Sequence, residues 1–140
     1  MANRVTKGRA LFGSLRGRKD GMGVFVQTNT VARTDTSAKT LFTLPVGAII
    51  VGLDVIGAAV SNAGTTATLS VGKSGGTGIE YLNAYDVKGA TGSGQQSPTA
   101  ALLMAPVKAT ADTVVTGTYA ETGTASTTGG PWAVVLQYAV

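Results

Sequence analysis

The sequence predicts an all-β fold: a compact antiparallel β-sandwich, jelly-roll-like, with about eight strands and an extended N-terminal arm. Charged residues are only 13% of the 140 residues, and Thr, Ala, Gly and Val dominate the rest, which favours strands and turns over helices. Short apolar runs recur about every ten residues, each bounded by Gly, Pro, Asn or Ser. Helix-start signals are nearly absent.

Charge divides the chain into two parts. Residues 1–23 hold six of the eleven basic residues and one acid, whereas residues 24–140 hold five basic and six acidic residues. Five glycines make the backbone of the first part too flexible to build a core alone. We therefore expect a flexible basic arm over residues 1–23 and one β-sandwich domain over residues 24–140.

Four strands are expected in the first half of the domain. Alternation in the third of them predicts one shared face for Ile49, Val51, Leu53 and Val55. Asp54 is then expected to face the other way. The four predicted strands are Val24–Asn29, Thr40–Leu44, Ala48–Gly57 and Thr65–Val71.

The second half is less regular. Ile79–Val87 fits both a helical turn and a strand, and we favour a short strand followed by a turn. The last strand alternates clearly, and we expect it in mid-sheet because a frayed strand would expose Trp132. The remaining predicted strands are Ala101–Ala105, Asp112–Ala120 and Trp132–Val140, and the predicted loops are Gly72–Gly78, Gly89–Pro98 and Glu121–Pro131.

Composition excludes several kinds of chemistry. The chain has no Cys and no His, which rules out disulfides, Ser-His and Cys-His nucleophiles and the common zinc sites. We expect no enzymatic activity and no cofactor. Most carboxylates are expected at strand ends and turns, although an all-oxygen calcium site stays open. The longest apolar run, Ala48–Val60, is interrupted by Asp54 and is too short for a bilayer, so we expect a soluble chain made in the cytosol.

Ala67–Ser74, ATLSVGKS, matches a relaxed phosphate-loop pattern in which Lys73 and Ser74 would meet phosphate and magnesium. The context argues against that function. Leu69 and Val71 continue the alternation of a strand, and glycines follow where the helix of a phosphate loop should begin.

The arm is the candidate binding segment. Its charges are suited to nucleic-acid phosphates or to an acidic protein surface, and the alternative is a merely solvated tail. Nucleic-acid binding favours aromatic residues among the arginines, and only one is present. An apolar trio inside the arm favours docking on a protein. The candidate residues are Arg4, Lys7, Arg9, Leu11, Phe12, Leu15, Arg16, Arg18 and Lys19.

The domain is also expected to form an assembly. A core of mainly Val, Ala and Ile buries little area per residue, and a small all-β chain with few charges needs its sheet edges covered.

Three segments resemble the capsid cement or head decoration proteins of tailed bacteriophages: Thr34–Ile50, TDTSAKTLFTLPVGAII; Ala63–Gly72, AGTTATLSVG; and Gly130–Val140, GPWAVVLQYAV. The resemblance covers most of residues 34–140 but not the arm. It implies a β-sandwich that is made in the host cytoplasm, trimerises and lies on the outer surface of an icosahedral capsid. There it would clamp neighbouring subunits of the major capsid protein.

Two rival functions remain at this stage. One is a coat or core protein whose arm binds packaged nucleic acid. The other is a fibre-base or glycan-binding module, in which the three long loops cluster at one end, although these loops are poor in aromatic residues for stacking on sugars.

Overall fold

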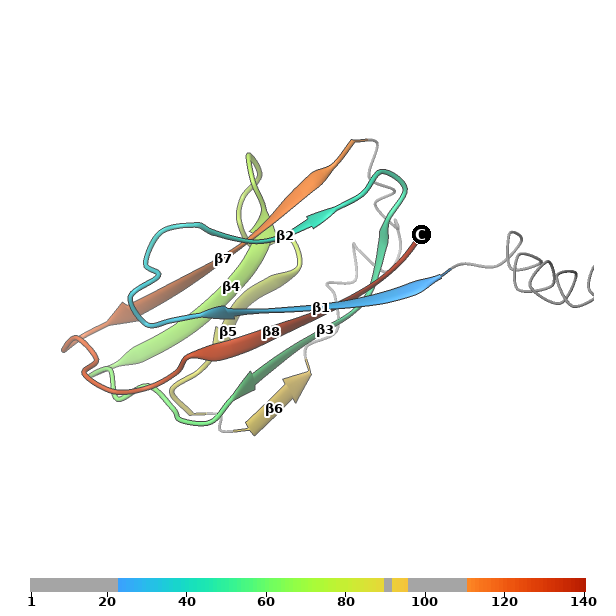
Figure 1. The fold of residues 1–140 in the computed structure, drawn as a ribbon. Coiled ribbons are helices and arrows are strands. Elements are labelled where there is room, and N and C mark those ends of the chain that lie inside the picture. Colours follow the sequence, from blue (N-terminus) through green and yellow to red (C-terminus); the bar gives the residue numbers. More distant parts are fainter. Residues whose placement is uncertain (1–22, 90–91, 96–110) are drawn as a thin grey trace, which may run out of the picture.

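A computed structural model describes residues 23–89, 92–95 and 111–140. Within these residues the protein consists of strands and turns without a helix, and the strands form two antiparallel four-stranded sheets (Figure 1). Sheet A has the strand order β1-β8-β3-β6 and sheet B the order β2-β7-β4-β5. The strands are β1 Val24–Val31, β2 Lys39–Leu44, β3 Ile49–Gly57, β4 Thr66–Lys73, β5 Leu82–Asp86, β6 Gly92–Gln95, β7 Thr113–Thr122 and β8 Trp132–Ala139. The predicted all-β sandwich is confirmed.

The chain crosses from one sheet to the other at nearly every connection. Only β4 and β5 follow each other within one sheet. The last strand, β8, pairs with β1 along one side, from Val24 opposite Ala139 to Val31 opposite Trp132, and with β3 along the other. The expected mid-sheet position of the last strand is therefore confirmed.

The core lies between the two sheets and follows the alternation of the sequence. In β4, Ala67, Leu69 and Val71 are fully buried and the residues between them are not. From sheet A, on the opposite side of the core, alternate residues of β8 are buried: Trp132, Val134 and Leu136. Trp132 stacks on Tyr119 of β7 with ring centroids 5.3 Å apart, and this pair joins the two sheets.

The predicted shared face of Ile49, Val51, Leu53 and Val55 is wrong for its first two members, because Ile50 rather than Ile49 packs against the core. The pairing of β3 with β8 shifts register between Ile50 and Gly52, which makes Val51 the extra residue of a β-bulge. Val51 is consequently 52% exposed, while Leu53 and Val55 beyond the bulge are buried as expected. Asp54 faces away from the core, as the alternation predicts.

One prediction in the middle of the chain is also wrong. The short strand expected in Ile79–Val87 is β5, and the turn held by Asp86 follows it, as predicted. The segment Gly89–Pro98 was expected to be a loop, yet it contains β6, which pairs with β3 from Asp54 opposite Gln95 to Gly57 opposite Gly92. The predicted strand Ala101–Ala105 lies outside the described residues. The other predicted strands agree with the structure to within two residues at each end.

Candidate partner-binding surfaces

The predicted binding residues of the arm lie outside the described residues. What the structure gives is the point at which the arm joins the domain. The backbone N–H of Gly23 donates to the carbonyl of Val140 at 3.2 Å, and the N–H of Val140 donates to the carbonyl of Gly23 at 3.0 Å. The arm therefore enters where β1 begins and β8 ends.

Exposed apolar side chains gather at the same end of the sandwich, which we call the apolar end. Here β1 and β3 begin, β8 ends and the turn between β2 and β3 lies. Among the described residues, six of the eight large hydrophobic side chains that are exposed belong to it. They are Val24, Phe25, Val26, Val46, Val51 and Val140. Clustered apolar surface of this kind marks an interaction site more often than scattered single residues do.

The first half of β1 carries the most exposed part of the apolar end. Val24 and Val26 are 62% and 60% exposed and point away from the core, and Phe25 between them is 51% exposed although its ring stacks on Tyr138 at 5.5 Å. Phe25 shares the inward face of β1, but the other sheet leaves it half uncovered. Sequence alternation alone would have assigned Phe25 to the core.

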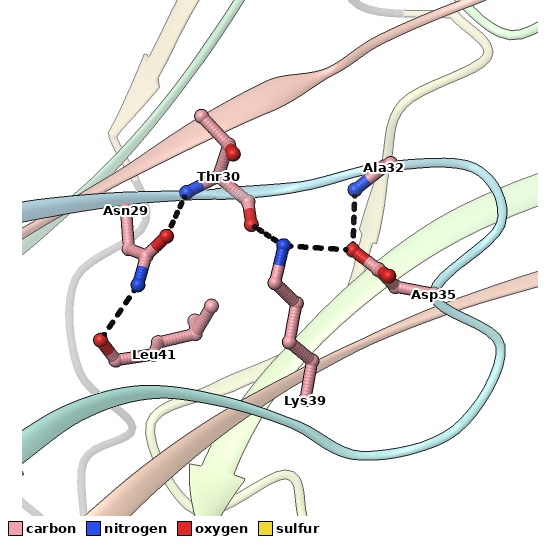
Figure 2. Close-up of polar contacts among 6 residues, drawn as sticks. All are labelled: Asn29, Thr30, Ala32, Asp35, Lys39 and Leu41. Atoms are coloured by element: carbon pink, nitrogen blue, oxygen red, sulfur yellow. Dashed lines mark hydrogen bonds and ion pairs between the residues drawn. The ribbon is translucent and has the colours of Figure 1, made fainter.

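The second half of β1 is tied to β2 instead (Figure 2). The amide nitrogen of Asn29 donates to the carbonyl of Leu41 at 2.9 Å, and Nζ of Lys39 donates to the carbonyl of Thr30 at 2.7 Å. The carboxylate of Asp35 completes this link, since it pairs with Lys39 at 3.1 Å and accepts from the N–H of Ala32 at 2.8 Å. These contacts close one side of the sandwich.

A buried polar cluster lies at the end opposite the apolar end. The hydroxyl of Tyr119 lies 2.6 Å from Oε2 of Glu121, 2.7 Å from Oγ of Ser61 and 3.3 Å from Oγ of Ser126. Arg33 donates to the carbonyl of Ser126 at 2.9 Å. Hydrogen bonds from Ser126 and then from Tyr119 lower the pKa of Glu121. The phenol thus joins the β3–β4 and β7–β8 connections, and Arg33 adds the β1–β2 connection through the carbonyl of Ser126.

Glu80 gives the physical reason why the phosphate-loop pattern is not a phosphate site. Backbone N–H groups of Lys73, Thr77 and Gly78 converge on the Glu80 carboxylate, at 2.9 Å and 3.1 Å for the first and last, and the Thr77 hydroxyl donates at 3.0 Å. Burial raises the pKa of Glu80, but these hydrogen bonds outweigh it and lower the pKa to about 2. The loop therefore cradles an anion that the chain itself supplies.

Two other carboxylates also serve turns, as expected for Asp in β proteins. Asp35 caps the turn after β1, and Asp86 accepts from the N–H groups of Lys88 and Gly89 at 2.8 Å and 3.0 Å. In the part of the chain that the structure describes, no three His, Cys, Asp or Glu side chains come together as a metal site. That same part holds no helix with the length and apolar character needed to cross a membrane.

The loops do not gather as the glycan-binding alternative requires. In the antiparallel pairing of β4 with β7, Lys73 lies opposite Val115 and Thr66 opposite Thr122. The loop Gly72–Gly78 therefore leaves one end of sheet B, and Glu121–Pro131 leaves the other (Figure 1). The expectation that the long loops form one binding face is wrong for these two.

Comparisons with known proteins give two similar structures. No protein-family model matches the chain, and no curated protein matches it in sequence. A chain of the acidic stable capsid structure of Helicobacter pylori bacteriophage KHP30 matches with a TM-score of 0.64 and 16% identity over 84% of this chain and 87% of that one. This match shows the shared fold. A chain of the cyanophage Pam1 capsid asymmetric unit matches with a TM-score of 0.62 and 27% identity over 86% of each chain. In fold and partly in sequence, the protein is similar to a component of a bacteriophage capsid.

Proposed function

We propose that this chain is a structural component of a bacteriophage virion. The observation that carries the proposal is the similarity to the cyanophage Pam1 capsid chain, which extends over 86% of both chains at 27% identity. The described residues fit a role in assembly. Their polar clusters are used to hold turns and loops in place, and their most unusual surface is an apolar one.

In more detail, we propose a cement or decoration protein that binds the outer surface of the capsid as a homotrimer and clamps neighbouring major capsid subunits. The nested strand order of the two sheets, with β1 beside β8 and β2 beside β7, supports the jelly-roll form expected of such a protein. A trimer would present three linked copies of each weak contact, so modest individual affinities would give firm attachment.

The arm serves as the anchor in this proposal. Gly23, at which the arm joins the domain, lies at the apolar end, and this supports a role in which the arm and the apolar end contact one partner surface. The basic residues of the arm would then face acidic groups of a major capsid subunit. Its apolar residues would enter a groove beside them.

Deletion of residues 1–22 tests the anchor. The truncated protein is expected to keep its fold and oligomeric state, because the hydrophobic core of the described residues is built from Val31 onward, but to be lost from purified capsids of its phage during sedimentation. A deletion of residues 2–7 only, which keeps Leu11, Phe12 and Leu15, is the matched control and should stay bound more firmly. Full occupancy of the capsid by the longer deletion would overturn the anchoring role.

The rival target of the arm is packaged nucleic acid. Light scattering of the full-length protein with fragmented double-stranded DNA at about 0.15 M salt separates the two, because surface charges are screened there beyond roughly 8 Å. The proposal predicts a trimer that does not change on adding DNA. DNA binding that falls steeply with salt would move the arm's target inside the particle.

A further inference from the structure

The free edge of β1 is open along the first half of the strand and protected at Thr30 in the second half. β1 is the edge strand of sheet A, so one side of its backbone pairs with β8 and the other side has no neighbouring strand. Because Gly23 and Val140 exchange both hydrogen bonds, the alternation of an antiparallel ladder directs the backbone groups of Val24, Val26, Thr28 and Thr30 to the free edge. These four residues decide what the edge can bind.

The far part of this edge is closed. Thr30 donates its N–H to Oδ1 of Asn29 at 2.8 Å and accepts at its carbonyl from Nζ of Lys39 at 2.7 Å (Figure 2). A charged lysine over an edge strand is a common means of preventing another strand from pairing there. The edge is therefore protected from Thr30 onward.

The near part of the edge is open. Within the described residues, the edge-facing N–H and C=O groups of Val24, Val26 and Thr28 have no hydrogen-bond partner. The segment from Val24 to Thr28 has no charge, no proline and no bulge. Val24 and Val26 are also the most exposed large hydrophobic residues that the structure describes. An open, uncharged and apolar edge of this kind is a template for a further strand.

We propose that the open edge of β1 pairs antiparallel with the same edge of a second copy of this chain, about a two-fold axis at Val26. In this register Val26 lies opposite Val26 of the other copy, and Val24 lies opposite Thr28. All edge groups of the three residues are then paired, and the strand stops where Lys39 closes the edge. Sheet A of one copy then continues across the axis into sheet A of the other copy.

Two features of the chain favour a second copy as the occupant. The segment that precedes β1 is ill suited to fold back on it, because residues 14–22 contain Arg16, Arg18 and Lys19 and lack β-branched residues. The open segment, in contrast, is complementary to itself in backbone groups and has no charge to repel its copy. The axis also lies at the apolar end, so pairing places the exposed valines of two copies side by side.

The inference does not depend on the proposed capsid role. It adds a two-fold contact to the proposed three-fold one, which would link neighbouring trimers. The two are tested separately, because cysteine trapping needs no capsid and failure of capsid binding would leave the pairing in place.

Cysteine trapping tests the register, and the absence of Cys from the chain gives a clean background. Opposed residues of a hydrogen-bonded pair have Cα atoms about 5.5 Å apart, which suits a disulfide. Full-length Val26→Cys is expected to form disulfide-linked pairs under a glutathione redox buffer at least tenfold faster than Thr28→Cys alone, whose two copies lie on either side of the axis. A mixture of Val24→Cys and Thr28→Cys proteins should link as fast as Val26→Cys.

A proline variant separates specific pairing from random collision. Introducing Val26→Pro into the Val24→Cys and Thr28→Cys proteins removes an N–H that points away from β8, so the fold should persist in thermal melts while mixed linking is lost. Equal linking rates for Val26→Cys and Thr28→Cys would overturn the proposal. So would linking in the mixture that survives Val26→Pro.

Discussion

At the scale of single residues, the one tryptophan is closely packed on both sides. Trp132 is 1% exposed, stacks on Tyr119 and lies directly opposite Gly57 of β3. A Cβ atom at Gly57 would overlap Cδ1 of the indole and lie 2.7 Å from its Nε1. The glycine is thus required by the close approach of the ring rather than by its own backbone conformation.

Gly57→Ala is expected to lower the free energy of unfolding by about 1–3 kcal/mol, the usual cost of inserting a methyl group into a packed core. Urea denaturation at one fixed protein concentration measures it. Gly52→Ala, in the same strand, is the matched control. Its added Cβ would lie at 3.4 Å from the side chain of Gln137, which can shift. A loss at position 52 as large as that at position 57 would contradict the role of the indole.

At the scale of elements, the turn between β4 and β5 is held by the Glu80 carboxylate. The pKa of Glu80 falls to about 2 in the folded protein, against an ordinary value of 4.5. A lowered pKa means that the carboxylate stabilises the fold above pH 4.5. This contribution is lost as the pH falls toward 2, because protonation removes the acceptor of the backbone N–H groups.

Glu80→Gln should therefore lower the melting temperature by a few degrees at pH 7 and by progressively less below pH 4.5, until the two proteins converge near pH 2. Thermal melts across this pH range test the expectation. Asp112→Asn removes an exposed carboxyl group that accepts no hydrogen bond from the described residues, and it serves as the control. A constant difference between wild type and Glu80→Gln at every pH would show that the carboxylate charge is not what holds the turn.

The elements also show what can be predicted from sequence. β4 and β8 are evident because buried and exposed side chains alternate without interruption. β6 could not be found in this way, since Gly92, Ser93 and Gly94 carry no apolar pattern and the strand forms through backbone pairing with β3. Val51 was assigned to the wrong face because it is the extra residue of a bulge, which the alternation of apolar residues does not reveal.

The binding surfaces were predictable only in part. The basic arm is visible in the distribution of charge alone, and its residues remain the predicted contacts. The apolar end depends on which strand ends meet in space and on where one sheet fails to cover the other. Neither property is encoded in a local pattern of residues.

At the scale of the whole molecule, a nearly neutral domain carries its positive charge on one segment. Five basic and six acidic residues nearly cancel over residues 24–140, whereas the arm has an excess of five positive charges. The proposed contact of the arm with an acidic capsid surface should therefore have a salt-sensitive part and a salt-insensitive part.

Replacement of Arg16, Arg18 and Lys19 by Ala is expected to flatten the salt dependence of capsid binding. Replacement of Leu11, Phe12 and Leu15 by Ala should weaken binding by a similar factor at every salt concentration. Co-sedimentation with capsids at a series of salt concentrations gives both slopes. An unchanged slope for the triple charge variant would show that the basic residues do not contact the capsid.

The position of β8 between β1 and β3 also affects how the protein can be made. β1 and β3 have no direct pairing, so sheet A lacks its centre until β8 has been synthesised and has left the ribosome. Contacts between β1 and β8 span more than a hundred residues, and such long-range pairing slows folding. During translation the incomplete sheet would present unpaired strands to other nascent chains, a state in which such chains aggregate.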